Sequence, residues 1–162
     1  MPTTTTSAFG NLATTMGSSA PLIHEILQKV NNAKDKPKKI EVLRQNDSQP
    51  LRQILKGAFD PKIVWELPDG VPPYKENDAP AGTEHTTLHQ EARRLHYFIK
   101  GANTLSKAKR ELMFIQVLEG LHADEAALLV NVKDKKLNQV YKGLTDAVVK
   151  EAFGWNDNYT RQ

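Results

Sequence analysis

Three histidines lie at a spacing that suits metal binding on a helix. His85, His89 and His96 occupy positions i, i+4 and i+11, and because a helix has 3.6 residues per turn, these positions return to nearly the same face. Imidazole nitrogens on one face are ligands that Zn²⁺ accepts. Glu84 precedes the first histidine, however, so the pattern is not the His-Glu-x-x-His motif of zinc enzymes. We interpret the three as surface or partner-facing residues, and expect no bound metal or other cofactor.

Phosphate binding is indicated where a predicted helix begins after Ser106. Lys107, Lys109 and Arg110 lie in its first turn, where unpaired backbone N–H groups and the helix dipole attract an anion. Cations at this end oppose the dipole and cost a few tenths of a kcal/mol, which a bound phosphate would offset. The alternative is ordinary capping with solvated lysines.

A second basic stretch runs from residue 133 to residue 145. Lys142, Gly143 and Thr145 supply a cation, a small residue that permits close approach, and a hydroxyl beside another helix start. Two such helix starts near each other would bind the phosphates of a nucleic-acid backbone without recognising its base sequence. The candidate DNA-binding residues are Lys107, Lys109, Arg110, Lys133, Lys135, Lys136, Asn138, Lys142, Gly143 and Thr145.

Motifs of the common enzyme classes are missing. The sequence contains no Gly-x-x-x-x-Gly-Lys, Gly-x-Ser-x-Gly or Gly-x-Gly-x-x-Gly pattern, and no pair of carboxylates stands out as general acid and base. It has no cysteine, which excludes disulfides, thiol catalysis and Cys-based metal sites and suits a reducing compartment. We therefore expect a protein without catalytic activity.

Helical periodicity dominates the segments that must position these residues. The 162 residues are 39% hydrophobic and 25% charged, which fits one globular domain. Apolar residues recur at helical spacing, so we expect an all-α fold of six or seven short helices, with Leu112, Phe114, Ile115 and Leu118 buried on one of them. The roles of Trp65 and Trp155 stay open between core packing, which is more common at such positions, and a binding role. The predicted helices cover about 20–32, 35–45, 48–59, 86–100, 106–120, 123–132 and 145–153.

The chain divides into an arm, a domain and a tail. Residues 1–19 form a Thr/Ser-rich arm that buries too little surface to order itself, residues 20–155 form the helical domain, and 156–162 form a C-terminal tail. Residues 62–66 are predicted to be extended, and a Pro-rich loop spans 67–84, a length typical of functional or mobile loops. With no apolar run of 18 residues and no basic, apolar leader, neither a membrane span nor a secretory signal is expected.

Charge is distributed unevenly along the chain. The net charge of +3 is the sum of +3 over residues 24–66, −3 over 67–90 and +3 over 91–162. Two basic regions around an acidic loop are compatible with a phosphate-binding face, although solvated lysines at helix ends explain the same counts. Besides the candidates above, Lys34, Lys36, Lys38 and Lys39 form a basic cluster.

The order of the predicted helices resembles the N-terminal DNA-binding domain of ATP-dependent DNA ligases. The similar segments are Leu-Ile-His-Glu-Ile-Leu at 22–27, Leu-Arg-Gln-Ile-Leu-Lys-Gly-Ala-Phe-Asp-Pro at 51–61, and the run from 112 to 153. The chain also resembles small proteins of cyanophages and other T-even-like tailed phages. The similarity covers about residues 21–155 and rests on helix order and apolar spacing.

In ligases the similar domain binds duplex DNA across the minor groove and helps to encircle a nick. The resemblance therefore implies DNA contacts for the basic residues at 107–110 and 133–145. Residues 138–142 are interpreted as an insertion before Gly143 relative to the ligase pattern. Because the sequence contains no Lys-x-Asp-Gly nucleotidyl-acceptor motif, we do not expect this chain to ligate DNA.

These observations predict a stand-alone phage protein, in the host cytoplasm, that binds duplex DNA largely without sequence preference. Neutralising about four to six phosphates would give a slope near −4 to −5 for log affinity against log salt. This prediction requires the cations at 107–110, 135 and 142 to share one exposed face.

Two alternatives remain open at this point. The first is a virion structural or adaptor protein that binds a phage or host protein through residues 1–19; its largest exposed apolar patch should include that arm or the loop at 65–74. The second is a remnant of an enzyme that uses the three histidines with a metal.

Overall fold

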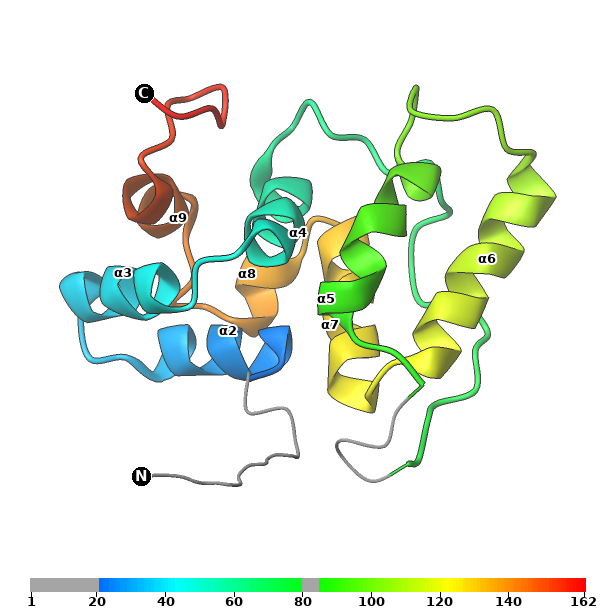
Figure 1. Cartoon of the computed structure of the whole chain (residues 1–162), viewed down its shortest axis with the longest axis horizontal. Coiled ribbons are helices and arrows are strands. Elements are labelled where there is room, and N and C mark those ends of the chain that lie inside the picture. The colour runs from blue at the N-terminus through cyan, green and yellow to red at the C-terminus, as the bar shows by residue number, and fades with distance from the viewer. Residues whose placement is uncertain (1–20, 80–84) are drawn as a thin grey trace, which may run out of the picture.

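The computed structural model describes residues 21–79 and 85–162, which form helices joined by loops (Figure 1). The predicted all-α class is therefore confirmed. The predicted arm at 1–19 and the end of the Pro-rich loop at 80–84 lie outside the described residues. The helices are α2 (Ile23–Asn32), α3 (Lys36–Gln45), α4 (Gln49–Phe59), α5 (Leu88–Glu91), η1 (a 3-10 helix, Ala92–Phe98), α6 (Lys107–Gly120), α7 (Ala123–Lys133), α8 (Leu137–Val140) and α9 (Asp146–Phe153).

Short polar side chains cap the helix starts, as their place in the sequence predicts. Each cap accepts the backbone N–H three residues later and satisfies a donor that has no partner within the helix. Gly154 ends α9 with φ +67°, a left-handed conformation that glycine adopts without strain. The capping residues are Asp35, Ser48, Thr87, Ser106 and Thr145.

The segment predicted as one helix over 86–100 changes type along its length. It is α-helical for one turn in α5 and then continues as η1. Ile99 is already extended and pairs with Trp65 in an isolated antiparallel bridge. The bridge includes hydrogen bonds from Glu66 N to Phe98 O (2.7 Å) and from Lys100 N to Val64 O (2.8 Å). The extended piece predicted at 62–66 thus forms in part: Lys62 lies in a turn, and the pairing is confined to the bridge at Trp65. The helix ends at Phe98, three residues before Gly101.

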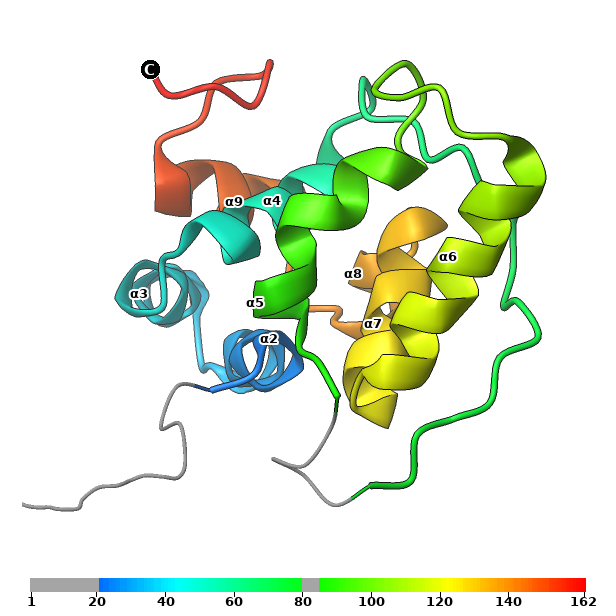
Figure 2. The same cartoon turned by 45° about the vertical axis from the view of Figure 1, so that its right-hand side comes forward.

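Two groups of helices share one core. In Figures 1 and 2, α2, α3 and α9 pack together at one end of the molecule, α5, η1 and α6 lie at the other, and α4 and α7 lie between them. The rings of Phe98 and Phe114 meet edge to face at 5.2 Å. Both tryptophans, whose roles the sequence left open, are buried, and Trp65 Nε1 donates to Gly57 O at 3.0 Å.

The buried face of α6 is rotated from the predicted one. Leu112 is 57% exposed, so its predicted burial is wrong, while Phe114 and Leu118 are buried as expected. Val117 completes the inner stripe, and Arg110 takes the position one turn before Phe114. None of the helices in the described part of the chain is long and apolar enough to cross a membrane.

Candidate functional site

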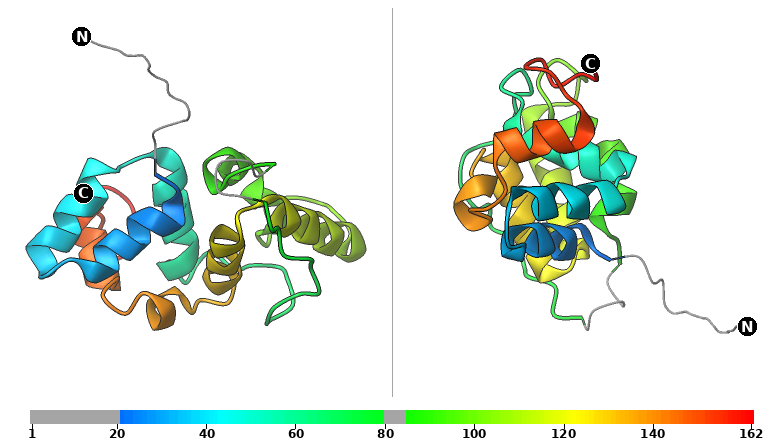
Figure 3. Two further views of the ribbon diagram at one scale, coloured as in Figure 1. Left: turned by 90° about the horizontal axis from the view of Figure 1, so that it is seen from below. Right: turned by 90° about the vertical axis from the view of Figure 1, so that its left-hand side faces the viewer.

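The predicted DNA-binding residues belong to two separated parts of the molecule. The start of α6, with Lys107 and Lys109, lies at the end of the long axis opposite to α9, whose start carries Thr145 (Figures 1 and 3). All three residues are exposed. The two predicted helix starts therefore do not face each other.

Arg110 has a structural role inside the domain. Its side chain is buried, and Nη2 donates to Leu105 O at 2.6 Å and pairs with Glu66 Oε1 at 3.3 Å. The guanidinium thereby joins the loop before α6 to the segment that follows α4. The expectation that Arg110 shares an exposed face with the candidate lysines is wrong, because its side chain is buried and the bonds of Nη2 are made inside the domain.

Lys133 is likewise buried and anchors the Pro-rich loop. Its ammonium donates to Pro68 O and Gly70 O, each at 2.9 Å, and forms an ion pair with Asp134. Asp134 in turn accepts the backbone N–H of Gly70 at 3.2 Å. Lys133 is therefore not available to a phosphate, contrary to its place in the predicted set.

Lys135 closes the C-terminal end of α4. Its ammonium donates to Gly57 O at 2.6 Å and to Asp60 O at 3.0 Å. Gly57 O lies in the last turn of α4, where carbonyls have no partner within the helix, and it also accepts from Trp65 Nε1; Asp60 O also accepts the backbone N–H of Ile63. Burial lowers the pKa of Lys135, and the nearby Asp60 carboxylate partly opposes this. Its backbone has φ +60°, so the turn after α7 bends sharply to place this contact.

Gly143 permits a close approach, but the approaching group belongs to the protein. Its N–H donates to Asn31 Oδ1 at 2.8 Å. The Lys39 ammonium lies against it, where it donates to Val30 O, Asn31 O and Ala33 O at the end of α2. A Cβ on Gly143 would lie 2.7 Å from Lys39 Nζ and 3.2 Å from Asn31 O.

Gly143→Ala is therefore expected to lower the free energy of unfolding by about 1–2 kcal/mol, a typical penalty for overpacking. The ammonium of Lys39 can leave the added methyl group only by giving up its carbonyls. Urea denaturation measures the effect, and Lys39→Ala combined with Gly143→Ala should show a smaller penalty for the methyl group. A Gly143→Ala midpoint equal to that of the wild type would contradict this contact.

The contact around Gly143 brings two basic segments together. Lys34 directly follows Ala33, and Lys38, in the first turn of α3, directly precedes Lys39. On the other segment, Lys142 directly precedes Gly143. All three lysines are exposed, and we call them the basic junction. Lys36 lies in the same turn but pairs with Glu151 at 3.1 Å.

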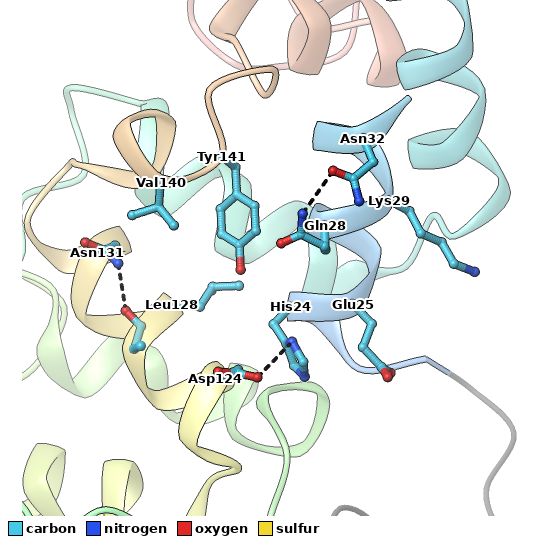
Figure 4. Close-up of a pocket in the computed structure, with 11 residues that line it drawn as sticks. His24, Glu25, Gln28, Lys29, Asn32, Asp124, Leu128, Asn131, Val140 and Tyr141 are labelled. Carbon is cyan, nitrogen blue, oxygen red and sulfur yellow. Dashed lines mark hydrogen bonds and ion pairs between the residues drawn. The ribbon is translucent and has the colours of Figure 1, made fainter. Parts of the chain in front are cut away.

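A groove of about 510 Å³ opens beside the basic junction, between α2, α7 and α8 (Figure 4). Gln28 and Asn131 line its walls, and Tyr141 directs its hydroxyl along the groove towards Leu128 (Figure 4). Burial raises the pKa of Tyr141, with further contributions from the Asp124 and Glu125 carboxylates. Polar side chains such as Gln28 and Asn131 line the groove. Because its pKa is raised, the hydroxyl of Tyr141 stays protonated at neutral pH.

The histidines singled out by spacing do not meet. His85 precedes α5 and is exposed, and the ring of His96 lies on that of Tyr97, with centroids 4.1 Å apart. Among the described residues, the metal-ligand atoms that converge are those of His24, His122 and Asp124. Two of the three, His24 and Asp124, line the groove (Figure 4). Spacing along one helix does not reveal this cluster, because its members come from two helices.

A family model described as a family of unknown function, DUF6433, matches residues 26–139. These residues make up well over half of the chain. The chain belongs to this family. The match begins within α2 and ends within α8, so the DUF6433 region includes Lys34, Lys38 and most of the groove. No curated protein and no solved structure matches the chain.

Proposed function

We propose that this DUF6433 protein binds duplex DNA through the phosphate backbone, without catalysis and largely without sequence preference. The observation that carries the proposal is the basic junction. Lys142 is held beside the turn of Lys34 and Lys38 through the Gly143–Asn31 hydrogen bond and the Lys39 ammonium. Lysines grouped in this way neutralise adjacent phosphates and release their counterions.

The proposal retains part of the set predicted from sequence and replaces the rest. Lys136, Asn138, Lys142 and Thr145 are exposed between α7 and α9, in the segment that resembles the DNA-contacting turn of the ligase domain. Arg110, Lys133 and Lys135 are assigned to the fold. Lys107 and Lys109 remain exposed, but at the far end of the molecule, and are proposed as peripheral contacts.

A binding assay with matched variants tests the proposal. Fluorescence anisotropy would compare intact, nicked and single-stranded DNA at ~50 mM salt, where phosphate contacts are strong. The triple substitution Lys34→Ala, Lys38→Ala, Lys142→Ala should weaken duplex binding by about tenfold or more. Lys100→Ala, Lys107→Ala, Lys109→Ala removes the same charge from exposed positions elsewhere and should weaken it less than about threefold.

The outcomes separate the two basic surfaces. Equal losses of DNA affinity in both triple variants would show a diffuse charge effect and contradict binding at the basic junction. A larger loss of affinity in the second variant would place the binding site at the start of α6. Preference for the nick would support docking in the manner of the ligase domain.

A second candidate function, as a virion structural or adaptor protein that binds another protein, has one specific observation in its favour. Val71 and Leu112 are 73% and 57% exposed, and the loop of Val71 forms a hollow with Ile115 of α6. Val71 belongs to the loop at 65–74, where the adaptor alternative expects an exposed apolar patch. Absence of DNA binding at ~50 mM salt, with a partner lost on Val71→Ser and Leu112→Ser, would favour this function.

A further inference from the structure

Three side chains beside the groove, two of which line it, have the chemistry of a metal site. His24 comes from the first turn of α2, and His122 and Asp124 come from the start of α7. Asp124 Oδ2 lies 3.9 Å from Nδ1 of His24 and 3.9 Å from Nδ1 of His122. One potential ligand atom from each of the three side chains lies within 4.8 Å of the others.

The fold holds these three side chains in place before any ligand arrives. The buried Glu125 carboxylate accepts the backbone N–H of Ile23 at 3.0 Å, which fixes the start of α2 against the start of α7. The imidazoles of His24 and His122 stack with centroids 5.0 Å apart and planes 14° apart. Both histidines are only partly exposed, while the Asp124 carboxylate faces solvent.

We propose that His24, His122 and Asp124 bind a divalent transition-metal ion such as Zn²⁺. Two imidazoles and a carboxylate are the donor set of three-ligand zinc sites, in which a fourth position faces water or a ligand. At bond lengths of about 2.0–2.1 Å, tetrahedral ligand atoms lie ~3.3 Å apart. The Nδ1 atoms now lie 3.9 Å from Asp124 Oδ2 and the imidazole planes are 14° apart, so binding of one ion requires the imidazoles to turn out of their stacked arrangement.

His122 also has a structural role that the site must accommodate. Its Nδ1 accepts the backbone N–H of Asp124 at 3.0 Å and so caps α7. Coordination through Nε2 retains this cap, whereas coordination through Nδ1 gives it up. A purely structural role for His122 therefore predicts no metal binding, which is the competing outcome of the test.

The test titrates tag-free, chelator-treated full-length protein with ZnCl₂ by calorimetry and with CoCl₂ by absorption spectroscopy. One ion per chain and the visible bands of tetrahedral Co²⁺ are expected. His24→Gln, His122→Asn and Asp124→Asn should each weaken binding at least tenfold. Asparagine at 122 is a good helix cap, so His122→Asn removes the metal ligand and keeps the cap.

The histidines predicted from spacing provide the matched controls. His89→Gln and His96→Gln remove imidazoles outside the cluster and should leave the affinity for Zn²⁺ unchanged. Failure of the wild type to bind either ion would overturn the proposal, as would binding that survives all three ligand substitutions. The result is independent of DNA binding, because none of the three ligands belongs to the basic junction.

Discussion

Glu125→Ala is expected to lower the free energy of unfolding by about 3–5 kcal/mol, because two buried backbone donors lose their acceptor at about 1–3 kcal/mol each. Glu125 is 0% exposed. Its two carboxylate oxygens accept separate backbone N–H groups, from Ile23 and from Leu88, each at 3.0 Å. One carboxylate therefore caps the starts of α2 and α5 from within α7, and alanine would leave both donors buried without this acceptor.

Glu125→Gln keeps the shape of the side chain but changes its hydrogen bonding, so it separates these two contributions to stability. In Glu125→Gln the amide oxygen can accept one N–H, but the amide NH₂ faces the other donor, so a loss between those of the wild type and the alanine variant is expected. Glu41→Ala, at an exposed position, should change stability by less than about 0.5 kcal/mol. Urea denaturation measures all three. A Glu125→Ala loss below 1 kcal/mol would show that these caps contribute little.

Lys133→Ala is expected to have the next largest effect, a loss of about 3 kcal/mol. The substitution leaves the Asp134 carboxylate without its ion pair and Pro68 O and Gly70 O without their donor. The loop from 67 to 74 should then detach from α7 while Lys75 N remains bound to Glu119 (2.8 Å).

Two measurements check this prediction. Denaturation gives the change in stability, and amide hydrogen exchange should show faster exchange around Gly70 in Lys133→Ala than in the wild type. Lys133→Met retains the apolar stem without the charge, so it reports the loss of the ammonium alone. DNA affinity lost in Lys133→Ala with unchanged stability and unchanged exchange would return Lys133 to the DNA-binding set.

Local rules predicted the helices well. Asp35, Ser48 and Thr145 cap the helices that follow them, because capping depends only on residues three positions apart. The 3-10 segment η1 was not predictable in this way, since its end is set by pairing between Trp65 and Ile99, which are distant in sequence.

The candidate site was less predictable, because the sequence does not show which cations find partners inside the protein. Lys135 bonds to Gly57 O, 78 residues away, and Lys133 bonds to Pro68 O, 65 residues away. A lysine whose ammonium caps distant carbonyls has the same sequence context as one that faces solvent. The basic junction depends in the same way on the Gly143–Asn31 contact, across 112 residues.

The salt dependence of duplex binding tests the proposed function most directly. Four phosphates neutralised by Lys34, Lys38, Lys136 and Lys142 predict a slope of about −3.6 for log affinity against log salt, and removal of the three basic-junction lysines should make the slope shallower by about 2.7. A wild-type protein that fails to bind at ~50 mM salt, or a slope that the triple substitution leaves unchanged, would contradict DNA binding through this surface.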